Sequence, residues 1–216
     1  MAFDYVLFDL DGTLTNPYEG ISKSVQYALQ SFGITENDEN ALKRFIGPPL
    51  WKSFADFYGF PEEKAKEAVI KYRERYNKIG VYENKLIDGV PETLKLLHDS
   101  GKKLFLATSK PLELAKIVLD YFDIKKYFDF LGGADFNFGR DEKWQVIEYV
   151  FDSTGIFDRQ SAVIVGDRMH DIIGAKRTGI KSIGVLCGFG DSKELTEYGA
   201  DYIADRFCDI APIILE

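Results

Sequence analysis

The chain has 216 residues, of which 45% are hydrophobic, and its 35 acidic residues outnumber its 27 lysines and arginines, which gives a formal net charge of -8. A chain of this length folds as one domain with an insertion or as two small domains, and this hydrophobic content is enough for a core. Because a nonspecific nucleic-acid binder needs a broad basic face, the acidic balance predicts no nucleic-acid partner.

The cysteines and the hydrophobic pattern indicate a compartment. Cys187 and Cys208 are the only cysteines and form no CxxC pair, which is typical of reduced thiols in a cytosolic protein. The first residues show no signal-like segment, and no apolar run reaches the roughly 18 residues of a membrane span. We therefore expect a cytoplasmic protein with no membrane partner, as a monomer or a homodimer.

A short apolar run, Tyr5 to Phe8, comes first and leads into Asp9, Asp11 and Gly12. The run is too short for a membrane span, so it predicts a buried strand. Side chains two positions apart lie on the same side of a strand, and the carboxyl edge of a parallel sheet is the usual ligand edge. Because two neighbouring carboxylates repel each other, we expect a divalent cation there, and Mg²⁺ commonly binds one or two carboxylates plus a substrate phosphate.

The block that follows, residues 16–85, shows only helical patterns. Apolar residues recur at helical spacing, and the breaks fall at Gly33, at Gly47-Pro48-Pro49 and before Pro61. The spacing predicts helices over 21–32, 37–46, 50–58 and from Pro61 to Tyr76. These helices form a small bundle inserted after the first strand.

Strands and helices then alternate to the end of the chain. We expect strands over 104–108, 128–131, 162–167, 182–186 and 202–204. We expect helices ending at Ser100, over 112–121, 143–153 and 171–178, near Leu195 and over 210–215. This alternation predicts an α/β fold with a doubly wound parallel sheet. The sheet domain comprises residues 1–15 and 86–216, and the helical insertion comprises 16–85.

Polar residues follow two further strands. Thr108, Ser109 and Lys110 follow one, and Asp167 follows another, with Asp171 close behind it. Because the carboxyl ends of parallel strands meet at one edge, these side chains are expected to converge with the first two aspartates. A hydroxyl, a lysine and an acid-held metal are what a phosphoryl group needs.

In their order, these residues resemble the motifs of the haloacid dehalogenase-like (HAD) hydrolases. The stretch from Asp9 to Leu14 resembles the first motif, Thr108 the second and Lys143 the third, and the stretch from Gly166 to Asp171 resembles the last. Each motif is short, but their order and spacing are specific. The chain as a whole is similar to phosphoglycolate-phosphatase-like members, which implies a Rossmann-like HAD core with an α-helical cap.

The resemblance implies a Mg²⁺-dependent phosphatase that acts through an aspartyl-phosphate. Asp9 attacks phosphorus, and Asp11 protonates the leaving alcohol and then takes a proton from water. The metal ligands implied are Asp9, the backbone carbonyl of Asp11, Asp167 and Asp171, and the phosphoryl group is held by Gly12, Thr108, Ser109 and Lys143. The partner is a small phosphorylated metabolite. Phosphoglycolate, a nucleotide monophosphate and a sugar phosphate all remain open.

Several assignments keep an alternative. Lys110 and Arg140 are alternatives to Lys143 as the cation that binds the phosphoryl group. Lys143 by itself is equally compatible with an ordinary surface lysine. Asp171 is also suited to cap its helix, with or without ligating the metal. In the insertion, the segment with Lys43, Arg44 and Gly47 is expected to contact the substrate; the alternative is an exposed basic pair at a helix break.

The function has alternatives as well. An inorganic pyrophosphatase is compatible with every motif. A phosphoglucomutase-like enzyme is disfavoured, because mutase relatives carry a histidine on entering the cap and the first histidine here is His98. A noncatalytic regulator that binds a phosphorylated ligand would normally have damaged motifs, and these are intact.

Overall fold

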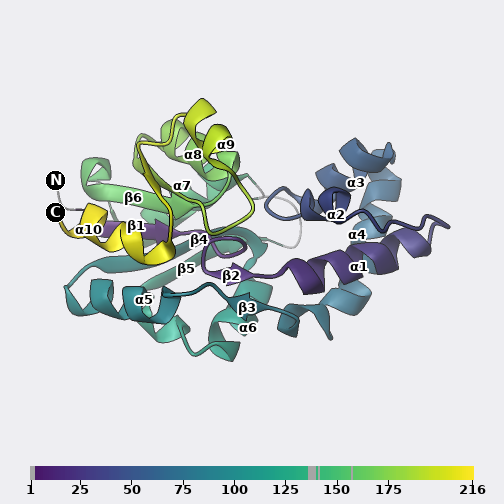
Figure 1. Cartoon of the computed structure of the whole chain (residues 1–216), viewed down its shortest axis with the longest axis horizontal. Helices are drawn as coiled ribbons and strands as arrows, with labels where there is room; N and C mark the ends of the chain where they lie inside the picture. The colour runs from purple at the N-terminus through teal and green to yellow at the C-terminus, as the bar shows by residue number, and fades with distance from the viewer. Residues whose placement is uncertain (1–2, 136–139, 141, 157) are drawn as a thin grey trace. The chain divides into compact units, whose positions relative to one another are not determined.

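The structure is a computed structural model that describes residues 3–135, 140, 142–156 and 158–216. The chain divides into two compact units. Unit 1 comprises Met1–Asn16 and Leu86–Glu216, and unit 2 comprises Pro17–Lys85 (Figure 1). The chain therefore leaves unit 1 after its first strand and returns to it about seventy residues later.

Unit 1 is built on a six-stranded parallel sheet with the strand order β5-β4-β1-β6-β7-β8. The strands are β1 (Tyr5–Phe8), β4 (Lys103–Pro111), β5 (Phe130–Ala134), β6 (Ala162–Gly166), β7 (Lys181–Val185) and β8 (Tyr202–Ala204). The first strand lies in the middle of the sheet, between β4 and β6. This order confirms the predicted doubly wound α/β fold.

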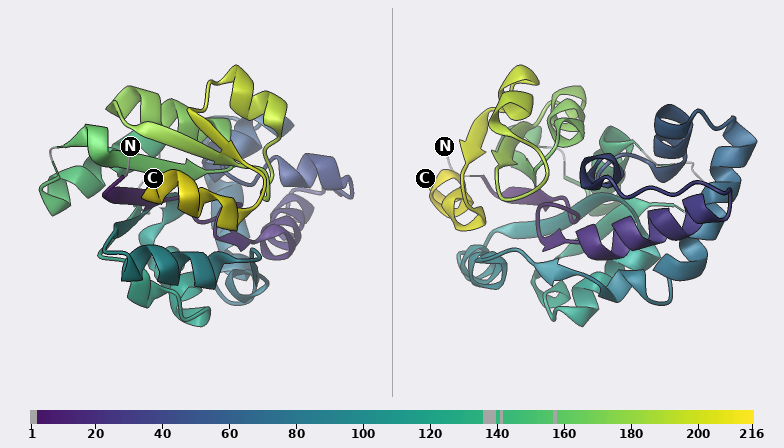
Figure 2. Two further views of the ribbon diagram at one scale, coloured as in Figure 1. Left: turned by 60° about the vertical axis from the view of Figure 1, so that its left-hand side comes forward. Right: turned by 45° about the vertical axis from the view of Figure 1, so that its right-hand side comes forward.

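Helices cover both faces of this sheet (Figures 1 and 2). One face carries α7 (Lys143–Thr154) and α8 (Met169–Thr178), with α9 (Ser192–Glu197) beside α8. The other face carries α5 (Val90–Asp99), α6 (Leu112–Tyr121) and α10 (Ile210–Leu215). A sheet covered on both faces has strands that are apolar throughout, which explains the unbroken apolar runs of the sequence.

The core is clearest around β1, where Val6, Leu7 and Phe8 are fully buried. Alternate side chains point to opposite faces. Leu7 packs with residues of α7 and α8, including Val146, while the ring of Phe8 lies 6.0 Å from that of Phe207. The strand is therefore held from both sides, and the chain that leaves it at Asp9 starts from a well-packed position.

Unit 2 is helical. Its helices are α1 (Tyr18–Gln30), α2 (Glu39–Lys43), α3 (Leu50–Tyr58) and α4 (Glu62–Tyr76), followed by the 3₁₀ turn η1 (Gly80–Tyr82). The helix α1 packs along α4. Where α1 meets η1, a Cβ atom on Gly20 would lie 2.0 Å from the carbonyl oxygen of Gly80, so only glycine allows this approach.

Several elements differ from the sequence-based expectation. The helix predicted over 37–46 is only α2. Asp38 caps its start by accepting a hydrogen bond from Asn40 N at 2.9 Å, and after Lys43 the chain continues as tight turns, with Phe45 N bonded to Leu42 O and Ile46 N to Lys43 O at 3.1 Å. The strand β4 extends to Pro111, since it continues to pair with β5 after an irregularity that follows Thr108. The short strands β2 (Thr15–Asn16) and β3 (Lys85–Leu86) were not predicted; they form a two-stranded sheet.

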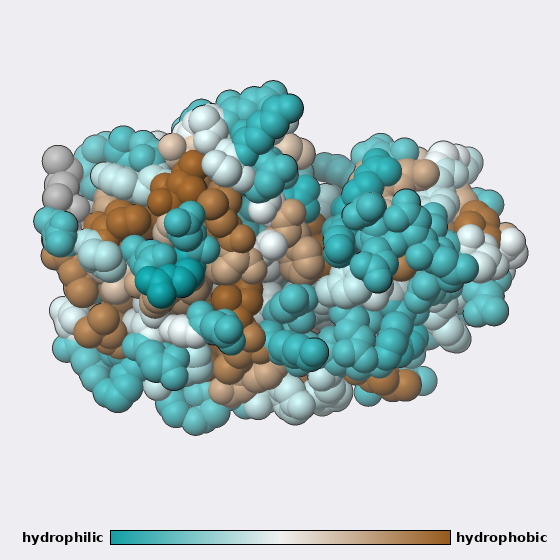
Figure 3. Space-filling view, in the orientation of Figure 1, coloured by the Kyte–Doolittle hydropathy of each residue, from teal (hydrophilic) through white to brown (hydrophobic). Residues whose placement is uncertain are grey.

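On the face drawn in Figure 3, hydrophobic side chains gather over unit 1, whereas the part formed by unit 2 is mainly hydrophilic.

Among the residues described, no helix combines the length and the hydrophobicity needed to cross a lipid bilayer.

Candidate active site

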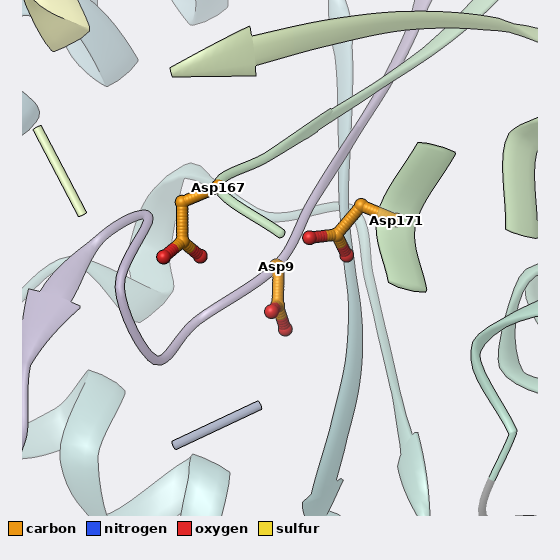
Figure 4. A group of neighbouring side chains, drawn as sticks. All are labelled: Asp9, Asp167 and Asp171. Atoms are coloured by element: carbon orange, nitrogen blue, oxygen red, sulfur yellow. The ribbon is translucent and has the colours of Figure 1, made fainter. Parts of the chain in front are cut away.

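Three aspartates meet at the carboxyl edge of the sheet. Asp9 follows β1 and Asp167 follows the neighbouring strand β6, while Asp171 lies in the first turn of α8. Their carboxylate oxygens lie within 4.8 Å of one another, and all three side chains are buried (Figure 4). The convergence follows from the parallel register of β1 and β6, because residues that follow paired strands leave the sheet together.

Burial makes this cluster electrostatically costly. Burial is the largest cause and, together with the nearby Asp171 and Asp9, raises the pKa of Asp167 to about 8, against the opposing effects of the hydrogen bond from Phe189 N and of Arg168. Burial likewise raises the pKa of Asp171, with Asp9 adding to the effect and Lys143 opposing it. The cluster therefore needs more positive charge than one lysine supplies if all three groups are to be ionised at neutral pH.

Lys143 is the lysine that reaches the cluster. Its ammonium group lies 2.8 Å from Asp9 Oδ1 and 2.8 Å from Asp171 Oδ1, and it donates to the carbonyl oxygen of Ala107 at 2.9 Å. Burial alone would lower its pKa, but Asp171 and Asp9 raise the pKa above the ordinary value, so the side chain stays charged. A Cβ atom on Gly174 would lie 2.7 Å from Lys143 Cγ, so this glycine makes the room for the lysine.

The two alternatives to Lys143, Lys110 and Arg140, have other partners. Arg140 donates from Nε to the carbonyl oxygen of Gly133 at 2.9 Å, and its guanidinium group lies 3.8 Å from the ring centroid of Tyr149. Lys110 is buried and donates to Asp11 Oδ2 at 2.6 Å. Each of the three basic side chains therefore has a different partner, and Lys143 is the one that lies against the aspartate cluster.

Asp11 pairs with Lys110 and also experiences the charges of Asp9 and Lys143 in the neighbouring cluster. Burial raises the pKa of Asp11 above that of a free aspartate, and the partner Lys110 opposes this shift. A carboxyl group with a raised pKa keeps its proton to higher pH, which suits a proton donor. The pairing with Lys110 also holds one carboxyl oxygen in a defined position.

The predicted phosphate-binding residues lie around the same strand ends. Thr108 is buried in β4, and its Oγ1 accepts a hydrogen bond from Lys110 N at 3.2 Å, while Ser109 is half-buried. Gly12 has φ = +92°, in the left-handed region, and a Cβ atom there would lie 2.3 Å from Asp167 Oδ2. Backbone conformation and space therefore both require glycine at this position.

The loop after β7 also belongs to the site, and sequence reasoning assigned it no role. Phe189 N donates to Asp167 Oδ2 at 2.8 Å, and Thr13 Oγ1 donates to Asp167 Oδ1 at 3.2 Å. A Cβ atom on Gly188 would lie 2.2 Å from the carbonyl oxygen of Gly12 and 2.3 Å from Asp167 Oδ2. The only sequence signal was a pair of glycines, Gly188 and Gly190, directly after a strand, which is also typical of an ordinary turn.

This packing makes Gly188→Ala a sensitive substitution. The added methyl group has no space between Gly12 and Asp167, so the loop must shift and the Phe189–Asp167 hydrogen bond is strained or lost. We expect a loss of about 1–3 kcal/mol in the free energy of unfolding and weaker Mg²⁺ binding, both measured by thermal denaturation with and without MgCl₂. Gly155→Ala is the control for the loss of a glycine, because a Cβ atom on Gly155 meets nothing within 4 Å and only its left-handed φ of +69° is affected. A Mg²⁺ response of Gly188→Ala as strong as that of the wild type would contradict the assignment of the loop after β7 to the site.

The residues predicted to contact substrate lie in unit 2. Lys43 and Arg44 are exposed at the end of α2; Lys43 Nζ lies 3.7 Å from Glu39 Oε2, and the guanidinium group of Arg44 lies 3.7 Å from the ring centroid of Phe57. Gly47 has φ = +106°, which a residue with a side chain rarely adopts. Their contact with a substrate stays a prediction.

The residues present fit a divalent cation. Three buried carboxylates face a single ammonium group, so the cluster lacks positive charge. Carboxylate oxygens are the ligands that Mg²⁺ prefers, and Mg²⁺ is commonly held by few protein groups together with a substrate phosphate. Asp9, Asp167 and Asp171 are therefore the residues that could hold it.

Known proteins resemble this chain along its whole length. Residues 6–185 match the model of a family described as haloacid dehalogenase-like hydrolase. A 5'-nucleotidase from Pseudomonas aeruginosa is 44% identical over 211 residues, which are 95% of each chain. Pyrophosphatase PpaX from Halalkalibacterium halodurans is 30% identical over 217 residues, covering 99% of this chain and 98% of its own. The crystal structure of a protein described as a predicted phosphatase from Clostridium acetobutylicum superimposes with a TM-score of 0.96 at 42% identity, covering 99% of both chains.

Proposed function

The chain belongs to the haloacid dehalogenase-like hydrolase family and is a phosphoric monoester hydrolase, and from this premise we propose that it hydrolyses small phosphomonoesters with the help of Mg²⁺. The observation that carries the proposal is the cluster of Asp9, Asp167 and Asp171, buried together and lacking positive charge. The proposed substrate is a nucleoside 5'-monophosphate, because the 5'-nucleotidase relative is 44% identical over 95% of both chains.

Asp9 is the proposed nucleophile. Its carboxylate oxygen attacks phosphorus and forms an aspartyl-phosphate, while the bond between phosphorus and the ester oxygen breaks. The ion pair with Lys143 at 2.8 Å orients the carboxylate. Splitting hydrolysis into two displacements replaces one difficult step by two easier ones.

Asp11 is the proposed acid and base. In the first step its carboxyl proton goes to the leaving alcohol, which departs neutral. In the second step water attacks the phosphorus of the aspartyl-phosphate, its proton goes to Asp11, and the carboxylate of Asp9 is released with inorganic phosphate. The raised pKa of Asp11 supports the first role, and Lys110, at 2.6 Å, holds the group in place for both.

The remaining residues of the site are proposed to bind the metal ion or the phosphoryl group. Asp9, the backbone carbonyl of Asp11, Asp167 and Asp171 are the proposed ligands of Mg²⁺, which when bound would offset the negative charge of the phosphoryl oxygens. Gly12, Thr108, Ser109 and Lys143 are the proposed contacts of those oxygens. We also propose that residues 16–85 act as the cap and that the protein works in the cytoplasm on a soluble metabolite.

The proposal is tested by phosphate release from a panel of compounds. Nucleoside 5'-monophosphates, phosphoglycolate, sugar phosphates and pyrophosphate are incubated with the enzyme and MgCl₂ or EDTA. We expect release only with Mg²⁺, highest with a 5'-monophosphate, and lost on Asp11→Asn for substrates with a poor leaving group because the leaving alcohol is no longer protonated. Pyrophosphate as the preferred substrate would favour the second candidate, which the 30% identity to a pyrophosphatase supports. Release that persists in EDTA would contradict the metal assignment.

The proposed cap contact has a separate test. Arg44→Ala removes a guanidinium group from the exposed end of α2, and we expect the ranking of the panel to change and KM to rise for the best substrate while kcat changes less. Arg177→Ala is the matched control, because Arg177 is an exposed arginine stacked on Trp144 in unit 1, at the end of α8 opposite to Asp171. Identical rankings for Arg44→Ala and the wild type would remove Arg44 from the substrate site.

A further inference from the structure

Glu194 lies outside every motif, yet it contacts the segment that joins two of the clustered aspartates. It belongs to the short helix α9, and its side chain is 22% exposed. One oxygen, Oε1, accepts a hydrogen bond from Met169 N at 2.8 Å and another from Arg168 Nε at 3.0 Å. Both partners lie between Asp167 and Asp171 in the sequence.

The contacted segment sets how far apart the two aspartates lie. Between them the chain leaves β6, turns at Arg168 and enters α8 at Met169. The first N–H groups of a helix have no partner inside the helix. Here Asp171 Oδ2 accepts from Arg168 N at 3.2 Å, and Glu194 accepts from Met169 N. A carboxylate at this end of a helix is also favoured by the helix dipole.

The helix that carries Glu194 is itself anchored. Glu194 N donates to Asp191 Oδ1 at 2.7 Å, which caps α9, and Leu195 is fully buried. A Cβ atom on Gly184 of β7 would lie 2.7 Å from Leu195 Cδ1, so the helix packs closely on the sheet. The carboxylate of Glu194 is therefore presented from a rigid support and not from a mobile loop.

We propose that Glu194 is a positioning residue for the metal-binding aspartates. By holding Arg168 and Met169 through one carboxylate oxygen, it keeps the turn between Asp167 and Asp171 in the form that brings both carboxylates to the same cation. The inference rests on the metal site proposed above. Groups that orient metal ligands in this way typically change metal affinity by about 10–100-fold when they are removed.

The test compares Glu194→Ala and Glu194→Gln with Glu197→Gln, which changes an exposed glutamate on the same helix. Mg²⁺ is titrated against the melting temperature of the substrate-free protein, and against phosphate release from the best substrate of the panel. We expect the half-saturating Mg²⁺ concentration to rise about 10-fold or more for Glu194→Ala and less for Glu194→Gln, which keeps a neutral acceptor for Met169 N. At saturating Mg²⁺, kcat returns close to the wild-type value, and Glu197→Gln matches the wild type throughout.

The outcomes separate the possible failures. An unchanged Mg²⁺ half-saturation in both Glu194 variants overturns the inference, even if their metal-free melting temperatures fall, because the role would then be packing alone. A loss of kcat that saturating Mg²⁺ does not restore overturns it too. If Glu194→Ala does not fold, Glu194→Gln and Arg168→Gln decide by the same criterion. If the wild type itself shows no Mg²⁺ response, the proposed function fails first, and the inference falls with it.

Discussion

Asp9→Asn is expected to abolish phosphate release, by roughly 10³-fold or more, which corresponds to about 4 kcal/mol of lost transition-state stabilisation. An amide oxygen is a far weaker nucleophile than a carboxylate oxygen, so no aspartyl-phosphate forms. The measurement is single-turnover phosphate release, together with mass spectrometry of the denatured protein to detect the covalent intermediate in the wild type and its absence in the variant.

The fold should survive this substitution. It removes one of three carboxylates that repel each other, and Lys143 keeps Asp171 and the carbonyl oxygen of Ala107 as partners. Asp4→Asn is the matched control, because Asp4 lies just before the same strand but is exposed and pairs with Lys102 at 3.4 Å. Wild-type turnover by Asp9→Asn would show that the chemistry does not start at this residue.

Asp167→Asn is expected to act in opposite directions on stability and on metal binding. The folded-state pKa of about 8 lies well above the ordinary value of 3.8. A group with a raised folded-state pKa contributes its stability fully below pH 3.8 and loses it as the pH rises toward about 8. In the metal-free protein at pH 8, the asparagine resembles the protonated carboxyl group, so the variant should be more stable than the wild type.

This expectation is measured by thermal denaturation in EDTA and in MgCl₂ at pH 5 and pH 8. For a chain of this size each kcal/mol gained shifts the melting temperature by about 2–4 °C, so the gain in EDTA at pH 8 should amount to several degrees and should shrink at pH 5. In MgCl₂ the order reverses, because the wild type gains binding energy that the variant has lost. Asp205→Asn, at an exposed aspartate, should change neither curve. A variant less stable than the wild type in EDTA at pH 8 would show that the carboxylate of Asp167 is not under electrostatic strain.

Local sequence determined the architecture of this protein. The apolar run at β1 and the strand–helix alternation after residue 86 predicted the doubly wound α/β fold, which the strand order and the relatives confirm. The family could be named from short motifs at the ends of strands, and the match over residues 6–185 confirms it. The elements can be predicted locally because a strand or helix shows its periodicity within about ten residues. The motifs could then be placed together because the carboxyl ends of parallel strands meet at one edge of the sheet, whatever the loops between them.

Only the tertiary structure decided which polar side chains meet. Spacing left Lys143, Lys110 and Arg140 as rivals, and the fold gives each a different partner. The loop at Gly188 showed no motif because its requirement is space beside Asp167, which lies about twenty residues away in sequence. Glu194 was missed for the same reason. A contact between distant residues depends on where packed helices place their side chains, and no periodicity within one segment records that placement.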